Sequence, residues 1–449
     1  MTELAYEIPT APGARPVVGH LIPFLKQPFT FLSRLPERGD LVKIRLGPKE
    51  AVVICDPGLT RKILVDDRTF DKGGLFLDRE REWLGDSVAT CTHGTHRHKR
   101  RLAQPAFHPK RIAGYANTMT TEMAAVVDGW HSGQVLDVYP EMFTITSRVF
   151  GATMFSSTLP AETLRQVIGD LTATFDGTFQ RTLLPDAINR LPIPSTRRYD
   201  HANRRLRKTM NDIIADRRAS GADNGDLLSA LLAAHDRETD PDGAIDGDVG
   251  DAVVTFFVAG TETTSSALAW VLYLLAQHPD IEAQLHAEID TVLGGRQPEH
   301  SDLERLNVAN RIVTETLRLY PPAWFFTRKV AAETGLGPYD LPVGSTIALS
   351  PYLIQRRADL YDDPDRFDPD RWLPEHATPS QEAFLPFGGG ARKCIGEVFG
   401  TTEIVLALAT IAGRWRLQTI PGLRIRPPLS VSLVPGGLRL RLLERRPGR

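Results

Sequence analysis

The chain is poor in cysteine and contains no long uninterrupted apolar run. Three cysteines among 449 residues cannot form a disulfide framework, so a fold stapled by disulfides is excluded and a reducing compartment is indicated. The N-terminal region lacks the basic segment and apolar core of a signal peptide, and no stretch of about 20 apolar residues follows it. We therefore expect a cytoplasmic protein without membrane insertion.

The charge is close to balanced, which removes another set of functions. A formal net charge of -2 provides no overall field that would attract nucleic acid. No Gly-x-Gly-x-x-Gly pattern follows a strand, so we expect no fused dinucleotide or flavin module. Neither a linker nor a repeat divides the chain, and we expect one domain over residues 1–449.

Helical periodicity dominates from about residue 57 to residue 300, and strand-like runs lie near both ends. Residues 41–46 and 51–55 flank a Gly-Pro turn, which is typical of a β-hairpin. Further short strands are expected over 336–350 and 415–443. The predicted fold class is mainly α with small β-sheets, a helix-rich α+β arrangement.

The most apolar helix is predicted over 253–275. It contains Gly260 and Glu262, which are unfavourable inside a membrane span. A helix buried inside a large protein explains the composition better.

The most informative segment is Phe387-Gly-Gly-Gly-Ala-Arg-Lys-Cys394-Ile-Gly396. Three glycines before a cysteine allow the backbone to turn tightly and to approach a flat ligand. A helix is expected over 395–415, and its N-terminus would stabilise a thiolate at Cys394, as a metal ligand requires. The alternative is a buried structural cysteine. Cys55 and Cys91 have no comparable setting and are not expected to be ligands.

This loop resembles the haem-binding loop of the cytochrome P450 family: Phe, two residues, Gly, one, Arg, one, Cys, one, Gly. Phe387, Gly390, Arg392, Cys394 and Gly396 occupy all five fixed positions. The resemblance implies a haem-enclosing fold with haem b, in which Cys394 is the iron ligand. Phe387 would then pack beside the sulfur, Gly388 would contact the haem, and Arg392 would contact a propionate.

A second motif, Ala259-Gly260-Thr261-Glu262-Thr263, lies on the apolar helix. In the family this pattern forms the oxygen groove. The resemblance implies that Ala259 and Gly260 line the haem, and that Glu262 and Thr263 deliver protons to dioxygen. The alternative is that the hydroxyl groups only bond back to carbonyls of their own helix.

Further residues resemble the family's structural and propionate-binding positions. Glu315 and Arg318 lie three apart on one helix face, and with Arg366 they are expected to form an ion-pair network beneath the haem. Arg328 would contact a propionate, with a solvated Arg-Lys pair as the alternative. Where the family usually has Trp-x-x-x-Arg, the chain has His96 and Arg100, and the histidine would replace the indole N–H donor.

A basic cluster, here called the basic face, comprises residues 97–101 with Lys110, Arg111 and Lys393. An acidic electron carrier could dock there, although a solvated run of charge is the alternative. The implied partners are a separate ferredoxin and an NADPH-linked ferredoxin reductase.

Aromatic and apolar residues near these motifs indicate an apolar small-molecule substrate. Each could equally be plain core. The candidates for the pocket wall are Phe76, Trp83, Phe256, Phe257, Trp324 and Phe325.

The resemblance implies a haem-thiolate monooxygenase. Across nearly the whole chain it extends to terpene-tailoring members from actinobacteria, which implies stepwise oxidation of one methyl group of a tricyclic sesquiterpene, pentalenene, to alcohol and then aldehyde in antibiotic biosynthesis. The alternatives are a haem peroxygenase that uses hydrogen peroxide and a non-catalytic haem sensor or carrier.

Overall fold

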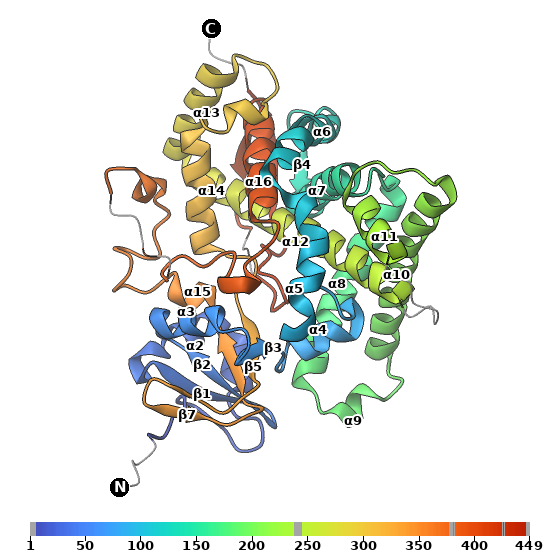
Figure 1. Cartoon of the computed structure of the whole chain (residues 1–449). Helices are drawn as coiled ribbons and strands as arrows, with labels where there is room; N and C mark the ends of the chain where they lie inside the picture. The colour runs from blue at the N-terminus through green and yellow to red at the C-terminus, as the bar shows by residue number, and fades with distance from the viewer. Residues whose placement is uncertain are drawn as a thin grey trace.

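A five-stranded sheet, built from strands within residues 41–72 and 326–349, lies beside the N-terminus, apart from the bulk of the helices (Figure 1). The computed structural model describes residues 6–237, 245–376, 380, 382–423, 425 and 427–445. The strands are β1 (Leu41–Leu46), β2 (Lys49–Ile54), β3 (Phe70–Lys72), β4 (Val135–Asp137), β5 (Phe326–Val330), β6 (Thr334–Leu336), β7 (Tyr339–Leu341), β8 (Thr346–Leu349), β9 (Trp415–Thr419) and β10 (Arg439–Glu444).

The helices make up most of the remaining structure and are named in chain order. They are α1 (Leu21–Lys26), α2 (Pro28–Ser33), α3 (Pro57–Val65), α4 (Leu77–Leu84), α5 (His93–Ala103), α6 (Pro109–Val127), α7 (Val138–Met154), α8 (Ala161–Leu183), α9 (Asp186–Asn189), α10 (Pro194–Ser220), α11 (Leu227–Arg237), α12 (Ile245–Gln277), α13 (Pro279–Leu293), α14 (Asn307–Leu319), α15 (Pro351–Ile354) and α16 (Glu397–Ala412).

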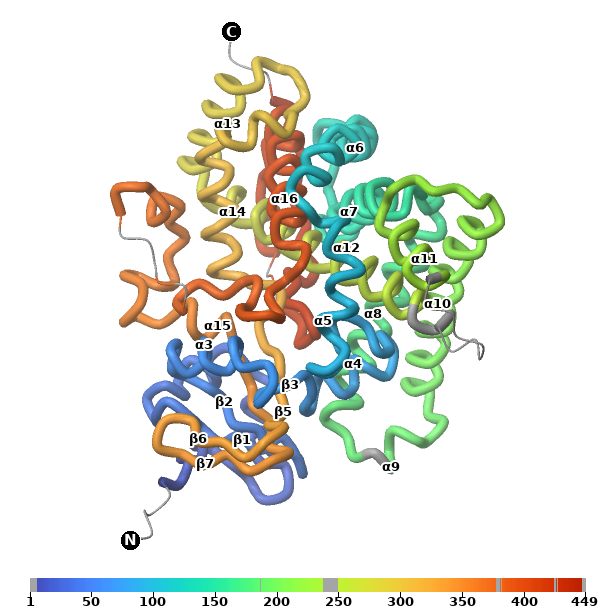
Figure 2. The backbone as a smooth tube through the Cα atoms, viewed as in Figure 1, coloured from blue at the N-terminus to red at the C-terminus, as the bar shows by residue number. Residues whose placement is uncertain are grey.

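The larger sheet has the strand order β1-β2-β8-β5-β3. The predicted hairpin is confirmed: β1 and β2 are antiparallel, with Leu41 opposite Ile54. β8 then adds to β2 in parallel. Figure 2 shows these early and late strands, in blue and orange, side by side. The sheet thereby brings Lys72 of β3 directly opposite Arg328 of β5, two residues 256 positions apart in the sequence.

The long helix α12 runs through the middle of the helical region, and α7, α10, α14 and α16 pack against it (Figure 1). The expected apolar helix over 253–275 is confirmed as part of α12. A Cβ atom on Gly260 would lie 2.2 Å from the ring of Phe150 on α7. Glycine at this position therefore lets α7 and α12 approach closely. No helix in the described part of the chain is long and apolar enough to cross a membrane.

The strands and helix boundaries near the C-terminus differ from the sequence expectation. Among the described residues of the predicted run of strands over 415–443, the strands are β9 and β10, and β10 pairs with both β9 and β4. α16 ends at Ala412 rather than continuing to 415, because Trp415 already begins β9. The three-residue strands β3 and β4 lie inside the region predicted as helical, since so short an element has no detectable periodicity.

Candidate active site

The loop before α16 holds Cys394 in a fixed turn. The Cys394 amide donates to the carbonyl of Phe387 at 3.0 Å. Gly388 has a φ of 69°, and Gly390 has a φ of 65° with its Cβ position 2.1 Å from the Leu64 carbonyl oxygen. Only glycine fits Gly390, because any side chain would collide with the end of α3.

The Cys394 side chain is exposed although protein atoms crowd around it. This crowding, together with the Glu397 charge, raises the pKa of the thiol, and a hydrogen bond from the Gly396 amide and the nearby Arg100 charge offset only part of the rise. α16 begins three residues later at Glu397, so its N-terminus also favours a thiolate. Cys394 is therefore the one free cysteine of the described chain that is exposed, while Cys55 and Cys91 are buried.

α16, which follows the cysteine loop, packs against α12. The Cβ position of Gly396 is 3.7 Å from the ring of Phe107, and that ring lies 5.6 Å from the ring of Phe256 on α12. Farther along, the Cβ position of Gly400 is 3.7 Å from the Thr264 hydroxyl oxygen. The part of α12 between Phe256 and Thr264 thus runs beside the segment that begins with Cys394.

Within this stretch of α12, one side remains accessible. Ala259 is exposed, and Gly260 and Thr263 are half-buried, whereas residues on both sides are buried. The Thr263 hydroxyl donates to the Ala259 carbonyl at 2.7 Å. That back-bond is the alternative foreseen from the sequence, and it leaves the oxygen of Thr263 free to accept a further hydrogen bond.

Glu262, in contrast, is buried, with 2% of its surface exposed. Its carboxyl accepts a hydrogen bond from the hydroxyl of Ser432 and is also bonded to Tyr139. Burial raises the pKa of Glu262 to about 7. The carboxyl is therefore partly protonated near neutral pH.

Basic side chains gather around the part of the cysteine loop that lies near β3, β5 and α5. Arg392 donates to Asp67 at 2.8 Å, to Asp71 at 3.1 Å and to the Cys91 carbonyl at 2.9 Å. Arg328 is buried, so the alternative of a solvated Arg-Lys pair is wrong. Burial and Arg392 together lower the pKa of Arg328 to about 10.

Two residues of α5 complete this cation cluster. The Arg100 guanidinium donates to the Lys393 carbonyl at 2.7 Å and so lies against the cysteine loop. His96 is buried, and burial, Arg392 and Arg100 lower its pKa to about 4. A neutral imidazole at pH 7 still offers one N–H donor, as an indole does.

Comparisons with known proteins agree with this geometry. The family model described as Cytochrome P450 matches residues 9–440. The chain belongs to the cytochrome P450 family. The crystal structure of the cytochrome P450DA heme domain superposes with a TM-score of 0.86 at 28% identity and covers 99% of each chain. The fold is accordingly the cytochrome P450 fold, and the chain is a cytochrome P450 monooxygenase that uses haem.

Two relatives within the family match most or all of the chain. Pentalenene oxygenase of Streptomyces avermitilis is 44% identical over 450 residues, which cover 100% of both chains. Cyclooctat-9-en-7-ol 5-monooxygenase of Streptomyces melanosporofaciens is 46% identical over 415 residues, which cover 92% of this chain and 90% of the relative.

The residues of this cytochrome P450 fit a bound haem. The buried Nη1 of Arg328 has no hydrogen-bond partner within the described chain, and the neighbouring Arg392 and Lys72 are also cationic. Burial and the charges of Arg328 and Arg392 lower the pKa of Lys72 well below its usual range. Arg392 is already paired with Asp67 and Asp71, whereas the buried Nη1 of Arg328 still lacks an acceptor within the described chain, and a propionate carboxylate would supply one. Lys72 was not foreseen, because a lysine in a three-residue strand carries no motif.

The network beneath the site is present, with one correction. Arg318 and Glu315 have no exposed side-chain surface and bond through two contacts of 2.8 Å. The third arginine is Arg371, whose Nε lies 3.6 Å from Glu315, whereas Arg366 is exposed and contributes only its carbonyl. The sequence has Pro-Asp-Arg followed by an aromatic residue twice, and the second copy forms a short helix at Pro369–Trp372 that faces α14.

The aromatic pocket candidates divide between two cores. Trp83, Phe256 and Phe257 belong to the helical core. Phe76, Trp324 and Phe325 belong to a core beside the larger sheet, where Phe76 and Phe325 make an edge contact at 5.6 Å. All six are buried. Their role in a substrate pocket remains a prediction.

Proposed function

We propose that this cytochrome P450 oxidises a terpene hydrocarbon, with pentalenene as the first candidate substrate. One methyl group would be converted to the alcohol and then to the aldehyde, as a step of antibiotic biosynthesis. The observation that carries the proposal is the 44% identity to pentalenene oxygenase over the full length of both chains. Cyclooctat-9-en-7-ol is the second candidate, since the relative named for it is 46% identical over 92% of this chain.

The site residues have distinct roles in this proposal. Cys394 holds the iron of haem b as a thiolate, with Phe387 and Gly388 beside it, and Ala259 and Gly260 line the oxygen side. Bound haem supplies the oxygen-activating chemistry. His96, Arg100, Arg328 and Arg392 surround the propionates, in support of which Arg328 has a buried nitrogen without a partner in the described chain. The Thr263 hydroxyl and the Glu262 carboxyl hold and move protons.

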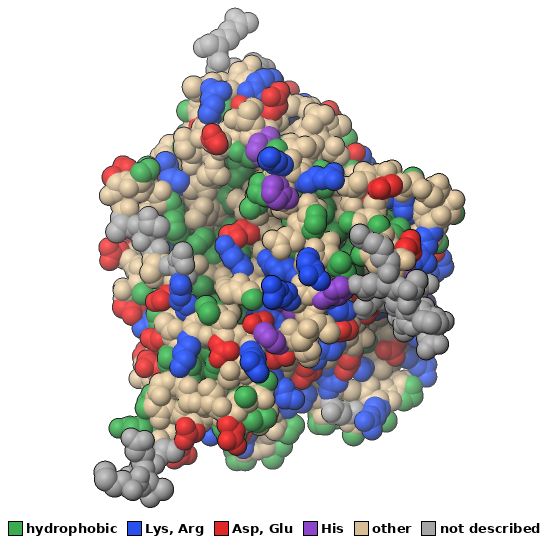
Figure 3. Space-filling model, in the orientation of Figure 1, with side chains coloured by type: hydrophobic (Ala, Val, Ile, Leu, Met, Phe, Trp, Pro, Cys, Tyr) green, Lys and Arg blue, Asp and Glu red, His purple; other side chains and the backbone are tan. Residues whose placement is uncertain are grey.

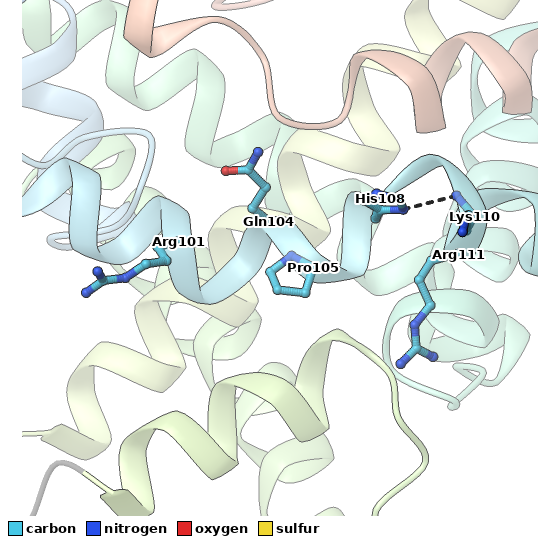
Figure 4. Close-up of a pocket in the computed structure, with 6 residues that line it drawn as sticks. All are labelled: Arg101, Gln104, Pro105, His108, Lys110 and Arg111. Atoms are coloured by element: carbon cyan, nitrogen blue, oxygen red, sulfur yellow. Dashed lines mark hydrogen bonds between the residues drawn. The ribbon is translucent and has the colours of Figure 1, made fainter.

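An acidic ferredoxin is the proposed electron donor, and its site is the basic face. Lys and Arg side chains gather over α5 and the cysteine loop (Figure 3). Arg97, Arg101, Lys110, Arg111 and Lys393 are exposed there. A hollow of about 590 Å³ between α5 and α6 is lined by Arg101, Gln104, Pro105, His108, Lys110 and Arg111. Figure 4 shows these six residues. A positive, concave surface close to Cys394 suits an acidic carrier.

The proposal also includes one haem-enclosing domain over the whole chain and a location in the cytoplasm. An NADPH-linked ferredoxin reductase would supply electrons to the ferredoxin. Cys55 and Cys91 are buried thiols without disulfide bonds, which suits a reducing compartment.

Spectroscopy and turnover test the proposal in sequence. The dithionite-reduced protein under carbon monoxide should absorb near ~450 nm, as a thiolate-ligated haem does. Cys394→Ala should lose this band, and Cys91→Ala serves as the matched control. Pentalenene and cyclooctat-9-en-7-ol are then each titrated into the ferric protein, and a low-to-high-spin shift identifies the better ligand.

Turnover distinguishes the chemical alternatives. With ferredoxin, reductase, NADPH and ¹⁸O₂, the alcohol product should carry one labelled oxygen. Product formation from hydrogen peroxide alone, without electrons or dioxygen, would instead establish a peroxygenase. Failure of both terpenes to shift the spin state or to react would overturn the substrate assignment.

A further inference from the structure

The buried acid of α12 is held by neutral hydroxyl groups from two distant parts of the chain. Ser432, in the irregular segment before β10, donates to the Glu262 carboxyl, and Tyr139 at the start of α7 is also bonded to it. Ser265, one turn farther along α12, lies beside Tyr139, and its hydroxyl donates to the Glu262 backbone carbonyl at 2.8 Å. Glu262 is thus connected to α7 and to the C-terminal segment.

The C-terminal segment is itself firmly attached at this point. The Leu433 carbonyl accepts hydrogen bonds from the hydroxyl of Ser266 at 2.6 Å and from the indole of Trp270 at 2.8 Å. The Leu433 amide donates to the Pro322 carbonyl at 3.0 Å. These contacts fix the backbone next to Ser432 against α12. The Ser432 hydroxyl is therefore held beside the Glu262 carboxyl.

The carboxyl lies away from the accessible side of α12. Ala259 and Thr263 are exposed or half-buried, whereas Glu262 is buried among Ser432 and Tyr139. Adjacent residues on a helix point about 100° apart, so Glu262 has to change its side-chain rotamer before it can approach the Thr263 hydroxyl. The bonds from Ser432 and Tyr139 are the interactions that such a rotation breaks.

We propose that Tyr139 and Ser432 are positioning residues, which together form a latch that holds Glu262 until its proton is needed at Thr263. The inference rests on the proposed role of Glu262 as the proton-delivering acid. With the latch closed, the carboxyl is kept out of the oxygen groove. With the latch open, the carboxyl turns toward Thr263.

The electrostatics of the latch support its function. Burial raises the pKa of Glu262 to about 7, and the hydrogen bonds from Ser432 and Tyr139 lower that pKa from a higher value. No charged group of the described chain contributes to the shift: the groups that face the carboxyl from α7 and from the C-terminal segment are both hydroxyls. Burial and Glu262 also raise the pKa of Tyr139 well above its usual range, so the phenol stays neutral. Two neutral donors let the acid keep its proton, whereas a cation would remove it.

The test uses the ferric holoenzyme and five variants. Infrared difference spectroscopy follows the carboxyl band as pH is varied, and the band is assigned to Glu262 by its absence in Glu262→Gln. Ser432→Ala and Tyr139→Phe each remove one donor, so the midpoint of the titration should rise by about one pH unit from near 7. Ser430→Ala changes a buried hydroxyl two residues away and should leave the midpoint unchanged.

Turnover is measured on the same proteins. In Ser432→Ala the fraction of electrons recovered as product should fall and peroxide release should rise, because an untethered acid delivers its proton at the wrong time. Ser432→Thr retains the hydroxyl and should restore both values.

The outcomes separate the latch from the role of the acid. An unchanged midpoint in folded, haem-loaded Ser432→Ala and Tyr139→Phe would overturn the latch. A raised midpoint combined with normal product recovery, and with normal turnover of Glu262→Gln, would show that Glu262 is not the proton donor, which overturns that part of the proposed function and leaves the hydrogen bonds in place.

Discussion

Arg318 reaches Glu315 across one turn of α14, and neither side chain has any surface exposed to solvent. The same guanidinium donates to the carbonyls of Gln355 at 2.9 Å, Pro364 at 2.7 Å and Arg366 at 3.1 Å. All five of its bonds therefore remain inside the protein. A single side chain joins α14 to the loop that leads to the cysteine segment.

Arg318→Lys should destabilise the protein although the charge is retained. An ammonium group has three donors and no planar fork, so two of the five acceptors are left without partners in a buried site. We expect a loss of roughly 3–5 kcal/mol in the free energy of unfolding. Denaturant unfolding followed by haem absorbance measures it. Arg305→Lys, an exposed residue just before α14, is the control and should change little; equal effects of the two variants would contradict the prediction.

Arg371→Ala and Arg366→Ala test which arginine completes the network. Arg371 lies 3.6 Å from the buried Glu315 carboxylate, whereas the Arg366 side chain is exposed and only its carbonyl is used. Removing the Arg371 side chain should cost about 1–2 kcal/mol and speed haem loss, and removing that of Arg366 should cost less than about 0.5 kcal/mol. Rates of haem transfer to excess apomyoglobin provide the second measurement. A larger loss of stability and faster haem loss in Arg366→Ala than in Arg371→Ala would support Arg366, the arginine predicted from the sequence, as the third member of the network.

The sequence predicted those parts of the molecule that local chemistry determines. The five fixed positions of the cysteine loop lie within ten residues, so the loop around Cys394 could be predicted without the fold. The hairpin of β1 and β2 and the interior of α12 have clear periodicity and were also predicted correctly.

What could not be predicted depends on distant segments meeting. Ser432 and Tyr139 have no motif, and only the fold brings them to Glu262 across 170 and 123 positions. The choice between Arg366 and Arg371 depends on which of two similar tetrapeptides packs on α14. Lys72 gains its cationic neighbours only through the pairing of β3 with β5.

Charge reversal on the basic face should weaken electron transfer without affecting the haem. Lys110 and Arg111 are exposed and line the hollow at the start of α6. In the double variant Lys110→Glu/Arg111→Glu, the KM for an acidic ferredoxin should rise roughly tenfold at low salt, with kcat and the carbon monoxide spectrum unchanged. The difference should shrink at high ionic strength, because salt screens exposed charges. Lys26→Glu, an exposed cation at the end of α1, is the control. If the KM for ferredoxin did not depend on salt concentration, the basic face would not be the docking site.

Glu403→Gln should stabilise the protein at neutral and alkaline pH. Glu403 lies in α16 with no exposed surface, neither carboxyl oxygen has a hydrogen-bond partner within the described chain, and burial raises its pKa well above the ordinary value of 4.5. The folded protein thus keeps a proton that the unfolded chain loses, so the wild type is penalised increasingly as pH rises above about 4.5. The variant does not titrate, and its free energy of unfolding should exceed that of the wild type by about 2 kcal/mol at pH 8. The two should converge toward pH 4.5, where the unfolded wild type is itself increasingly protonated.

Denaturant titrations at pH 5, 6.5 and 8 measure the difference, and the exposed Glu304→Gln should follow the wild type throughout. A constant difference across this range would mean that Glu403 has a partner that keeps it charged in the folded protein.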